Sequence, residues 1–217
     1  MGAAFQPAAN LWAAIALALG GGVIAAAIVF GWLWQTSDFA RGVRSAQAQP
    51  VPFSHQHHVS GLGIDCRYCH DTVERAATAG MPPTYTCMTC HSQIWTNARI
   101  LEPVRQSLAQ NKPIVWRRVT DLPDYAYFNH SIHIAKGVGC FSCHGDVAAM
   151  PLTWKARTLT MGFCLDCHRD PGPNLRPRDK IFDTTARPRP DPASARTLLA
   201  FYHIGSRDLT DCSICHR

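Results

Sequence analysis

Cysteine and histidine recur in this chain at one fixed spacing, Cys-x-x-Cys-His, and this spacing suits a specific chemistry. The pentapeptide occurs five times and uses all ten cysteines of the 217-residue chain. Its two thiols can form thioether bonds to the vinyl groups of a porphyrin, while the histidine binds the iron. In chain order the copies, called sites 1 to 5 here, are Cys66/Cys69/His70, Cys87/Cys90/His91, Cys140/Cys143/His144, Cys164/Cys167/His168 and Cys212/Cys215/His216.

Two other uses of paired cysteines are disfavoured. Zinc ribbons need four ligands per metal from two paired knuckles, and disulfides need only thiols. Neither explains a histidine directly after every pair. The sequence therefore predicts five covalently attached haem c groups.

Histidines outside the pentapeptides are candidates for the far faces of the irons, because a low-spin electron-transfer haem needs a second protein ligand. They are His55, His57, His58, His130, His133 and His203. The pattern Phe-x-His stands before sites 1, 3 and 5. We therefore expect His55, His130 and His203 to serve these three sites, respectively.

A second histidine follows three residues later in two of these patterns, as His58 and His133. Residues three apart lie on the same side of a helical turn, so we expect this pair to bind the irons at sites 2 and 4. His57 points elsewhere on such a turn and is interpreted as a hydrogen-bonding or surface residue.

Methionine is the alternative far-face ligand, and it raises the potential of a haem relative to two histidines. Met161 precedes Cys164 by three residues, and Met150 lies between sites 3 and 4. Because methionine is more often a core filler, both residues remain alternatives to histidine.

The Phe-x-His patterns, called histidine blocks here, and the attachment sites that follow them recur at nearly equal intervals, which indicates an internal repeat. Two repeats, about 53–127 and 128–200, carry two sites each, and a third, 201–217, carries one. Fifteen prolines, fifteen glycines and few long apolar runs leave little for a conventional core. We therefore expect mostly coil with short α-helices wrapped round the macrocycles, and a proline-rich connector at 171–192 lying along the surface.

The N-terminal part of the chain has the properties of a membrane anchor. Residues 11–34 contain no charged side chain, and about 20 apolar residues suffice to cross the hydrocarbon core. Trp12 and Trp34 stand near its ends, where interfacial aromatics belong. A cleaved signal peptide would need a basic start and a shorter apolar region. We predict a retained anchor with a linker at 1–49 and a haem domain at 50–217.

The orientation of this anchor involves two opposing arguments. Arg41 and Arg44 follow the span, and the positive-inside rule alone would place them in the cytoplasm. Covalent haem attachment is expected on the outer face of the bacterial cytoplasmic membrane. Five attachment sites outweigh two arginines, so we expect the haem domain on the periplasmic side.

The formal charge of +6 omits the propionates that each haem would add. Most of the basic residues are arginines, whose planar fork suits carboxylates. Part of the basic excess is therefore interpreted as counter-charge for haem. The chain has no motif for nucleic-acid binding.

Three stretches carry a resemblance to a known family: 128–144, 159–169 and the C-terminal 212–217. With the N-terminal span and five sites, this layout resembles the pentahaem cytochrome c subunit of alternative complex III, and its blocks also occur in class III-type multihaem cytochromes. The resemblance implies a bacterial quinol-oxidising membrane complex. Its other subunits would include an iron–sulfur subunit, a monohaem cytochrome c and polytopic membrane subunits. The third repeat departs from the pattern because it lacks the second histidine.

The function expected from these observations is electron transfer, without catalysis by the chain alone. Electrons from quinol would pass through the five haems to a periplasmic acceptor. One alternative is a membrane-anchored multihaem quinol dehydrogenase feeding a periplasmic reductase. Another is a multihaem reductase of a small nitrogen or sulfur compound, which would require an open iron position.

Overall fold

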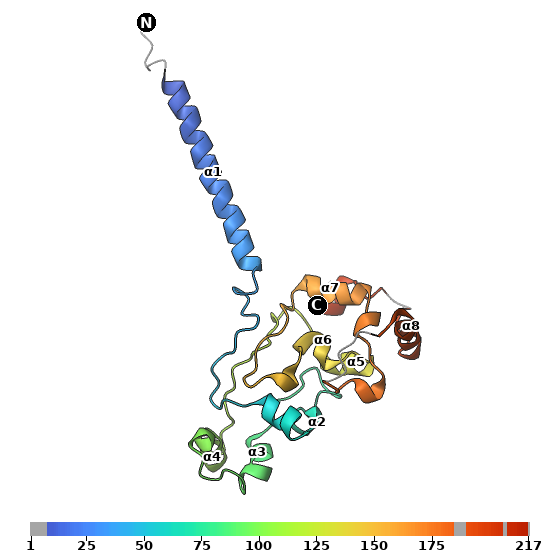
Figure 1. The fold of residues 1–217 in the computed structure, drawn as a ribbon. Coiled ribbons are helices and arrows are strands. Elements are labelled where there is room, and N and C mark those ends of the chain that lie inside the picture. Colours follow the sequence, from blue (N-terminus) through green and yellow to red (C-terminus); the bar gives the residue numbers. More distant parts are fainter. Residues whose placement is uncertain (1–7, 185–189, 206–207, 217) are drawn as a thin grey trace. The chain divides into compact units, whose positions relative to one another are not determined.

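The computed structural model describes residues 8–184, 190–205 and 208–216. The chain divides into two compact units, Met1–Val43 and Arg44–Arg217. The second unit holds all five attachment sites and is called the haem unit below (Figure 1).

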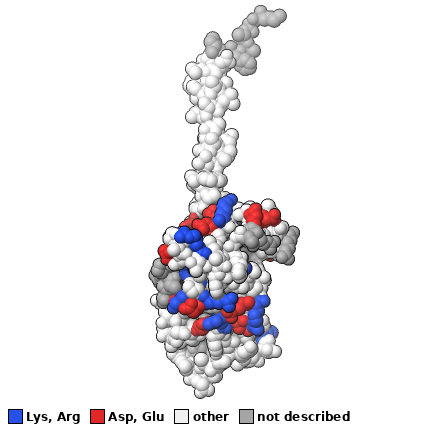
Figure 2. Space-filling model, turned by 90° about the vertical axis from the view of Figure 1, so that its right-hand side faces the viewer, with Lys and Arg blue, Asp and Glu red and all other residues white. Residues whose placement is uncertain are grey.

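The first unit is built on one long helix, α1, which spans Ala9–Thr36 and has no buried residue. At 1.5 Å per residue it is about 40 Å long, which exceeds the roughly 30 Å of a hydrocarbon core. Its mean hydropathy over 18 residues is 2.4, and its surface shows no charged group in Figure 2. By length and composition, α1 is able to cross a membrane.

The haem unit consists of short helices joined by turns and coil, as the sequence predicts, and this confirms the expected fold class. Its described residues contain no strand beyond the isolated bridges Ala46–Trp154 and Val138–Leu175. The helices are η1 (Gln56–Gly61), α2 (Cys66–Cys69), α3 (Thr84–His91), η2 (Arg99–Leu101), α4 (Glu102–Gln110), α5 (His130–Ala135), α6 (Cys140–His144), η3 (Val147–Ala149), α7 (Met161–Arg169), η4 (Gly172–Asn174), η5 (Arg178–Lys180), α8 (Pro192–Phe201) and α9 (Cys212–Cys215).

The cysteine pair of every attachment motif lies on a helix, and local capping explains where three of these helices begin. The side chains of Asp65, Thr160 and Asp211 accept hydrogen bonds from backbone N–H groups in the first turns of α2, α7 and α9. Such caps satisfy donors that have no partner within the helix. One helical turn places residues i, i+3 and i+4 on the same side. Both thiols of a motif and its histidine can therefore face one porphyrin.

The apolar core of the haem unit is small. One cluster is formed by Val51, Leu101 and Val104, and a second by Val73, Ile134 and Ile181. Two such clusters bury little apolar surface for a unit of this length, and small cores rarely stabilise a fold without covalent or metal staples.

We therefore predict that the chain does not fold without haem. When it is made without haem attachment, limited proteolysis should degrade the haem unit at rates typical of an unfolded chain, whereas the holoprotein resists. In the holoprotein, thioether bonds and axial ligands would link segments of the chain and stabilise the fold. A compact, protease-resistant haem-free form would contradict this prediction.

The connector at 171–192 differs from the surface segment predicted above. Leu175 has an exposed fraction of 0% and Arg176 of 8%. The reason is that this segment pairs with the loop leading into site 3: the N–H of Arg176 donates to the carbonyl of Gly137 at 2.7 Å. The prediction of a surface connector is therefore wrong for its first half, and Pro188 lies outside the described residues.

Candidate haem-binding sites

Three of the predicted far-face histidines lie opposite a histidine from an attachment motif. The ring centres are 6.2 Å apart in each of the pairs His58–His91, His130–His144 and His133–His168. Two metal–nitrogen bonds of about 2 Å, with each ring centre about 1 Å beyond its nitrogen, would place two imidazoles on one iron about 6 Å apart. The spacing of these side chains therefore fits a haem iron at sites 2, 3 and 4, respectively.

The ring nitrogens Nδ1 of seven histidines contact backbone carbonyl oxygens, and these contacts orient the rings. The pairs are His58 with Ser54 (2.8 Å), His70 with Gly80 (2.7 Å), His91 with Ile94 (3.1 Å), His130 with Ala77 (2.8 Å), His133 with Asn129 (2.7 Å), His168 with Leu209 (2.7 Å) and His216 with Tyr125 (2.9 Å). A carbonyl can only accept, so Nδ1 carries the proton and donates it. Nε2 is then left with the lone pair that binds a metal.

At site 1 the predicted far-face ligand, His55, interacts electrostatically with His70 of the attachment motif. Burial, and after it the nearby His70, lower the pKa of His55 to about 4. The Nδ1 of His55 lies 2.9 Å from the hydroxyl oxygen of Thr153. His55 thus differs from the seven histidines described above, whose Nδ1 atoms contact backbone carbonyl oxygens. Sequence reasoning missed this threonine, because the contact joins residues 98 positions apart.

We predict that Thr153→Val raises the reduction potential of the haem at site 1. Without the hydroxyl as acceptor, Nδ1 of His55 loses its partner, and the imidazole donates less electron density to the iron. A shift on the order of tens of millivolts is expected, measured by spectroelectrochemical titration of the holoprotein.

Thr84→Val is the matched control for this variant. Thr84 stands in the corresponding Met-Pro-x-Thr stretch of the first repeat, and its hydroxyl pairs with Ser107 rather than with a histidine. If both variants leave all potentials unchanged, or both shift them alike, the role given to Thr153 is wrong.

Two phenylalanines give the two histidine blocks the same geometry. Phe53 stacks on His58 with ring centres 4.3 Å apart and meets His55 edge-on at 5.0 Å. Phe128 stacks on its second histidine, His133, at 4.5 Å. It also meets the first histidine of its block edge-on, at 4.7 Å. Each phenylalanine therefore contacts both histidines of its block, and so constrains the angle between two predicted far-face ligands.

Each histidine block is held by the other repeat. The N–H of His130 donates to the carbonyl of Ala77 at 3.0 Å, and the N–H of Gln56 donates to that of Met150 at 3.0 Å. The hydroxyl of Ser60 donates to the carbonyl of Ala148 at 2.5 Å. Each of the first two repeats therefore holds the histidine block of the other in place through backbone hydrogen bonds.

Site 5 has a different arrangement. His203 is exposed and has a φ of 52°, and the described residues show no ring contact between it and His216. The ring of His216 instead stacks on Tyr125, with ring centres 6.0 Å apart. The structure therefore does not bring the predicted pair of site 5 together.

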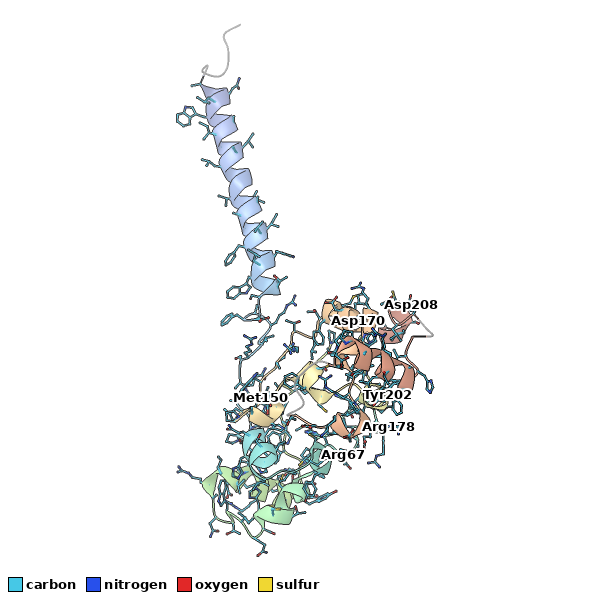
Figure 3. The ribbon with its side chains drawn as sticks, turned by 45° about the vertical axis from the view of Figure 1, so that its right-hand side comes forward. Arg67, Met150, Asp170, Arg178, Tyr202 and Asp208 are labelled. Carbon is cyan, nitrogen blue, oxygen red and sulfur yellow. The ribbon has the colours of Figure 1, made fainter. Side chains whose placement is uncertain are left out.

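The two candidate methionines have opposite environments. Met150 is 2% exposed and belongs to the buried core; Figure 3 marks its position. Met161 is 61% exposed at the first residue of α7. Because sites 3 and 4 already have facing histidines, the geometry favours histidine over methionine at both.

Burial shifts the pKa values of all three motif residues at site 3. Burial raises the pKa of Cys140 to about 12 and that of Cys143 to about 11, and it lowers the pKa of His144 to about 4. Cys90 of site 2 and Cys212 of site 5 are, by contrast, exposed. The sites therefore differ in their access to solvent.

His57, the sixth histidine, is exposed and stacks on Trp95 with ring centres 5.9 Å apart. Trp95 also approaches His91, at 6.4 Å. His57 therefore lies beside site 2, and its aromatic partner is a tryptophan.

Fold and sites together define the class of protein: the chain belongs to the multihaem cytochrome c family and is an electron-transport protein with covalently bound c-type haem. The family model "Cytochrome c7 and related cytochrome c" matches residues 126–217, which contain sites 3 to 5. The chain is similar to the menaquinone reductase multihaem cytochrome c subunit of Nitratidesulfovibrio vulgaris (strain Hildenborough). The two are 31% identical over 163 residues, which cover 65% of this chain and 76% of that protein.

Proposed function

We propose that this protein carries five haem c groups and is the electron-transfer subunit of a membrane-bound, quinol-oxidising complex. Electrons would pass from quinol, through the haems, to a periplasmic acceptor. The observation that carries this proposal is the set of three histidine pairs with ring centres 6.2 Å apart. Two axial histidines suit an iron that exchanges electrons rather than one that binds a substrate.

The residues have distinct roles in this proposal. The ten cysteines anchor the porphyrins, and the histidine of each motif binds the near face of its iron. His55, His58, His130 and His133 bind the far faces at sites 1, 2, 3 and 4, and His203 remains the predicted ligand of site 5. The bound haems would supply one-electron chemistry between ferric and ferrous iron, while backbone carbonyl groups hold seven of the imidazoles in the tautomer that binds iron.

The membrane part of the proposal rests on α1. The helix would anchor the chain in the bacterial cytoplasmic membrane, with the haem unit on the periplasmic side. Partner subunits would provide the quinol site, because α1 has no ionisable residue in its interior. The expected partners are the iron–sulfur, monohaem cytochrome c and polytopic subunits that the resemblance to alternative complex III implies.

A second candidate differs in the direction of electron flow. The relative in N. vulgaris is named as a subunit of a menaquinone reductase, so a related complex here would pass electrons from a periplasmic donor to a quinone. The dehydrogenase that feeds a periplasmic reductase is a third arrangement of the same subunit. All three candidate functions use the same five haems and differ in the partners that donate and accept the electrons.

One experiment tests these candidates. The complex is purified in mild detergent, its subunits are identified by mass spectrometry, and its haem absorption is followed after addition of menaquinol or ubiquinol. Reduction of the haems by quinol, followed by reoxidation with a periplasmic cytochrome or copper protein, is the expected result. Haems that stay oxidised with quinol but are reduced from the periplasmic side would favour the quinone reductase, and a chain mass without five haems would refute the proposal.

A further inference from the structure

Sites 1 and 2 are direct neighbours. Tyr68 lies inside the motif of site 1 and Thr89 inside that of site 2, and their hydroxyl oxygens are 2.7 Å apart. Phe53 contacts His55 and His58, the far-face histidines of the same two sites. The two attachment motifs are therefore joined by a hydrogen bond, and their predicted far-face histidines share a phenylalanine.

Sites 1 and 3 are neighbours as well, although sites 2 and 3 follow each other in the sequence. His130 of site 3 contacts the carbonyl of Ala77, seven residues after the site 1 motif. Val73 and Ile134 share a core cluster on which Cys140 of site 3 packs. Among the described residues, no hydrogen bond or ring contact joins the attachment motif of site 2 to that of site 3.

Sites 3, 4 and 5 follow in sequence order. Phe128 contacts His130 and His133, the far-face histidines of sites 3 and 4. The Nδ1 of His168, at site 4, lies 2.7 Å from the carbonyl oxygen of Leu209, three residues before the motif of site 5. In Figure 1 the helices α3, α2, α6 and α7 accordingly succeed one another along the haem unit, with the C-terminal end near α7.

We propose, on the basis of the electron-transfer function above, that the five haems form one row in the order 2–1–3–4–5, with sites 2 and 5 as the ends at which electron donor and acceptor dock. Each step moves one electron, so one iron is oxidised as its neighbour is reduced, and no proton or group is transferred. The exposed attachment thiols, Cys90 and Cys212, belong to the two ends. Site 3, whose two attachment thiols are partly buried, lies at the centre.

The order can be measured by NMR on the intact holoprotein in detergent. In the fully reduced, low-spin state the haems are diamagnetic, and nuclear Overhauser effects between their edge protons identify neighbours. Each haem is assigned through contacts with the side chains of its own motif. We expect contacts between haems 1 and 2, 1 and 3, 3 and 4, and 4 and 5. A contact between haems 2 and 3 without one between 1 and 3 would overturn the order.

Paired variants provide a second, independent measurement. Removal of haem 2 by Cys87→Ala with Cys90→Ala should leave the contacts of haem 1 with 3, 3 with 4, and 4 with 5 unchanged. Removal of haem 1 by Cys66→Ala with Cys69→Ala should leave haem 2 without a haem neighbour. If haem 2 instead keeps a neighbour, the order is wrong. If a variant does not fold, the contacts of the unmodified holoprotein decide.

This test is separate from that of the proposed function. The contacts report geometry whether or not quinol reduces the protein. An order that differs from 2–1–3–4–5 would leave the quinol-linked function intact. Failure of quinol to reduce the haems would, in turn, leave the order intact.

Discussion

In the holoprotein carrying His130→Ala, we expect one haem of the five to lose its far-face ligand and to become high-spin. His130 faces His144 with ring centres 6.2 Å apart, and alanine has no group that can bind iron. Electron paramagnetic resonance should then show one more high-spin ferric haem than in the unmodified protein. The reduced protein should likewise bind carbon monoxide at one additional site.

Two further variants make this result specific. His57→Ala is the matched control, because His57 is exposed, stacks on Trp95 and is not a predicted ligand, so its loss should add no high-spin haem. His130→Met should restore a low-spin haem, add a long-wavelength sulfur-to-iron band and raise one potential on the order of 100 mV, within the roughly 0.8 V range that axial ligands span. If all haems of the His130→Ala protein stay low-spin, the ligand assignment at site 3 is wrong.

The variant Gly137→Ala should be strongly destabilised, because the loop before site 3 has no room for a side chain. Gly137 has a φ of 79°, and an added Cβ would meet the ring of Tyr202. A left-handed backbone costs an alanine about 1–2 kcal/mol, and overpacking adds about 1–3 kcal/mol. We expect a loss of about 3 kcal/mol in the free energy of unfolding, measured in guanidinium by the disappearance of the low-spin spectrum.

Gly63→Ala separates the two causes of this loss. Gly63 has a φ of 69°, and an added Cβ there would meet no atom within 4 Å. The control therefore carries the backbone cost without the clash and should lose about 1–2 kcal/mol. Equal losses in the two variants would show that contact with Tyr202 does not matter.

The clash matters because Tyr202 joins distant parts of the haem unit. Its hydroxyl donates to the carbonyl of Arg176 at 2.7 Å, and its backbone carbonyl accepts from Lys136 at 2.8 Å. The N–H of Arg176 in turn donates to the carbonyl of Gly137. This set of contacts fixes the loop that leads into α6; Figure 3 marks the position of Tyr202.

The contacts that anchor Tyr202 also affect the position of the next residue, His203. Tyr202 ends α8 and is 4% exposed, so the chain is held at this point. His203 follows in a left-handed conformation and lies exposed. A local Phe-x-His pattern predicts the same role for His203 as for His55 and His130, but the pattern contains no information on where the preceding tyrosine is anchored.

The sequence by itself determined the features that depend on short spacings. Attachment needs two thiols and a histidine within one helical turn, so Cys-x-x-Cys-His is readable without a structure. The same holds for the block Phe-x-His-x-x-His, whose predicted partners His91, His144 and His168 stand at the expected ring distances in the structure. The apolar run inside α1 is equally local.

The tertiary structure alone decided the features that depend on distant segments. Thr153 reaches His55 across 98 positions, and Ala77 reaches His130 across 53, so no local pattern indicates either contact. The burial of Leu175 depends on its pairing with Val138, and the proposed placement of site 1 between sites 2 and 3 depends on contacts between the first two repeats. The loops that pack together determine which haems are neighbours. Because these loops lie far apart in the sequence, a local pattern cannot predict the order of the haems.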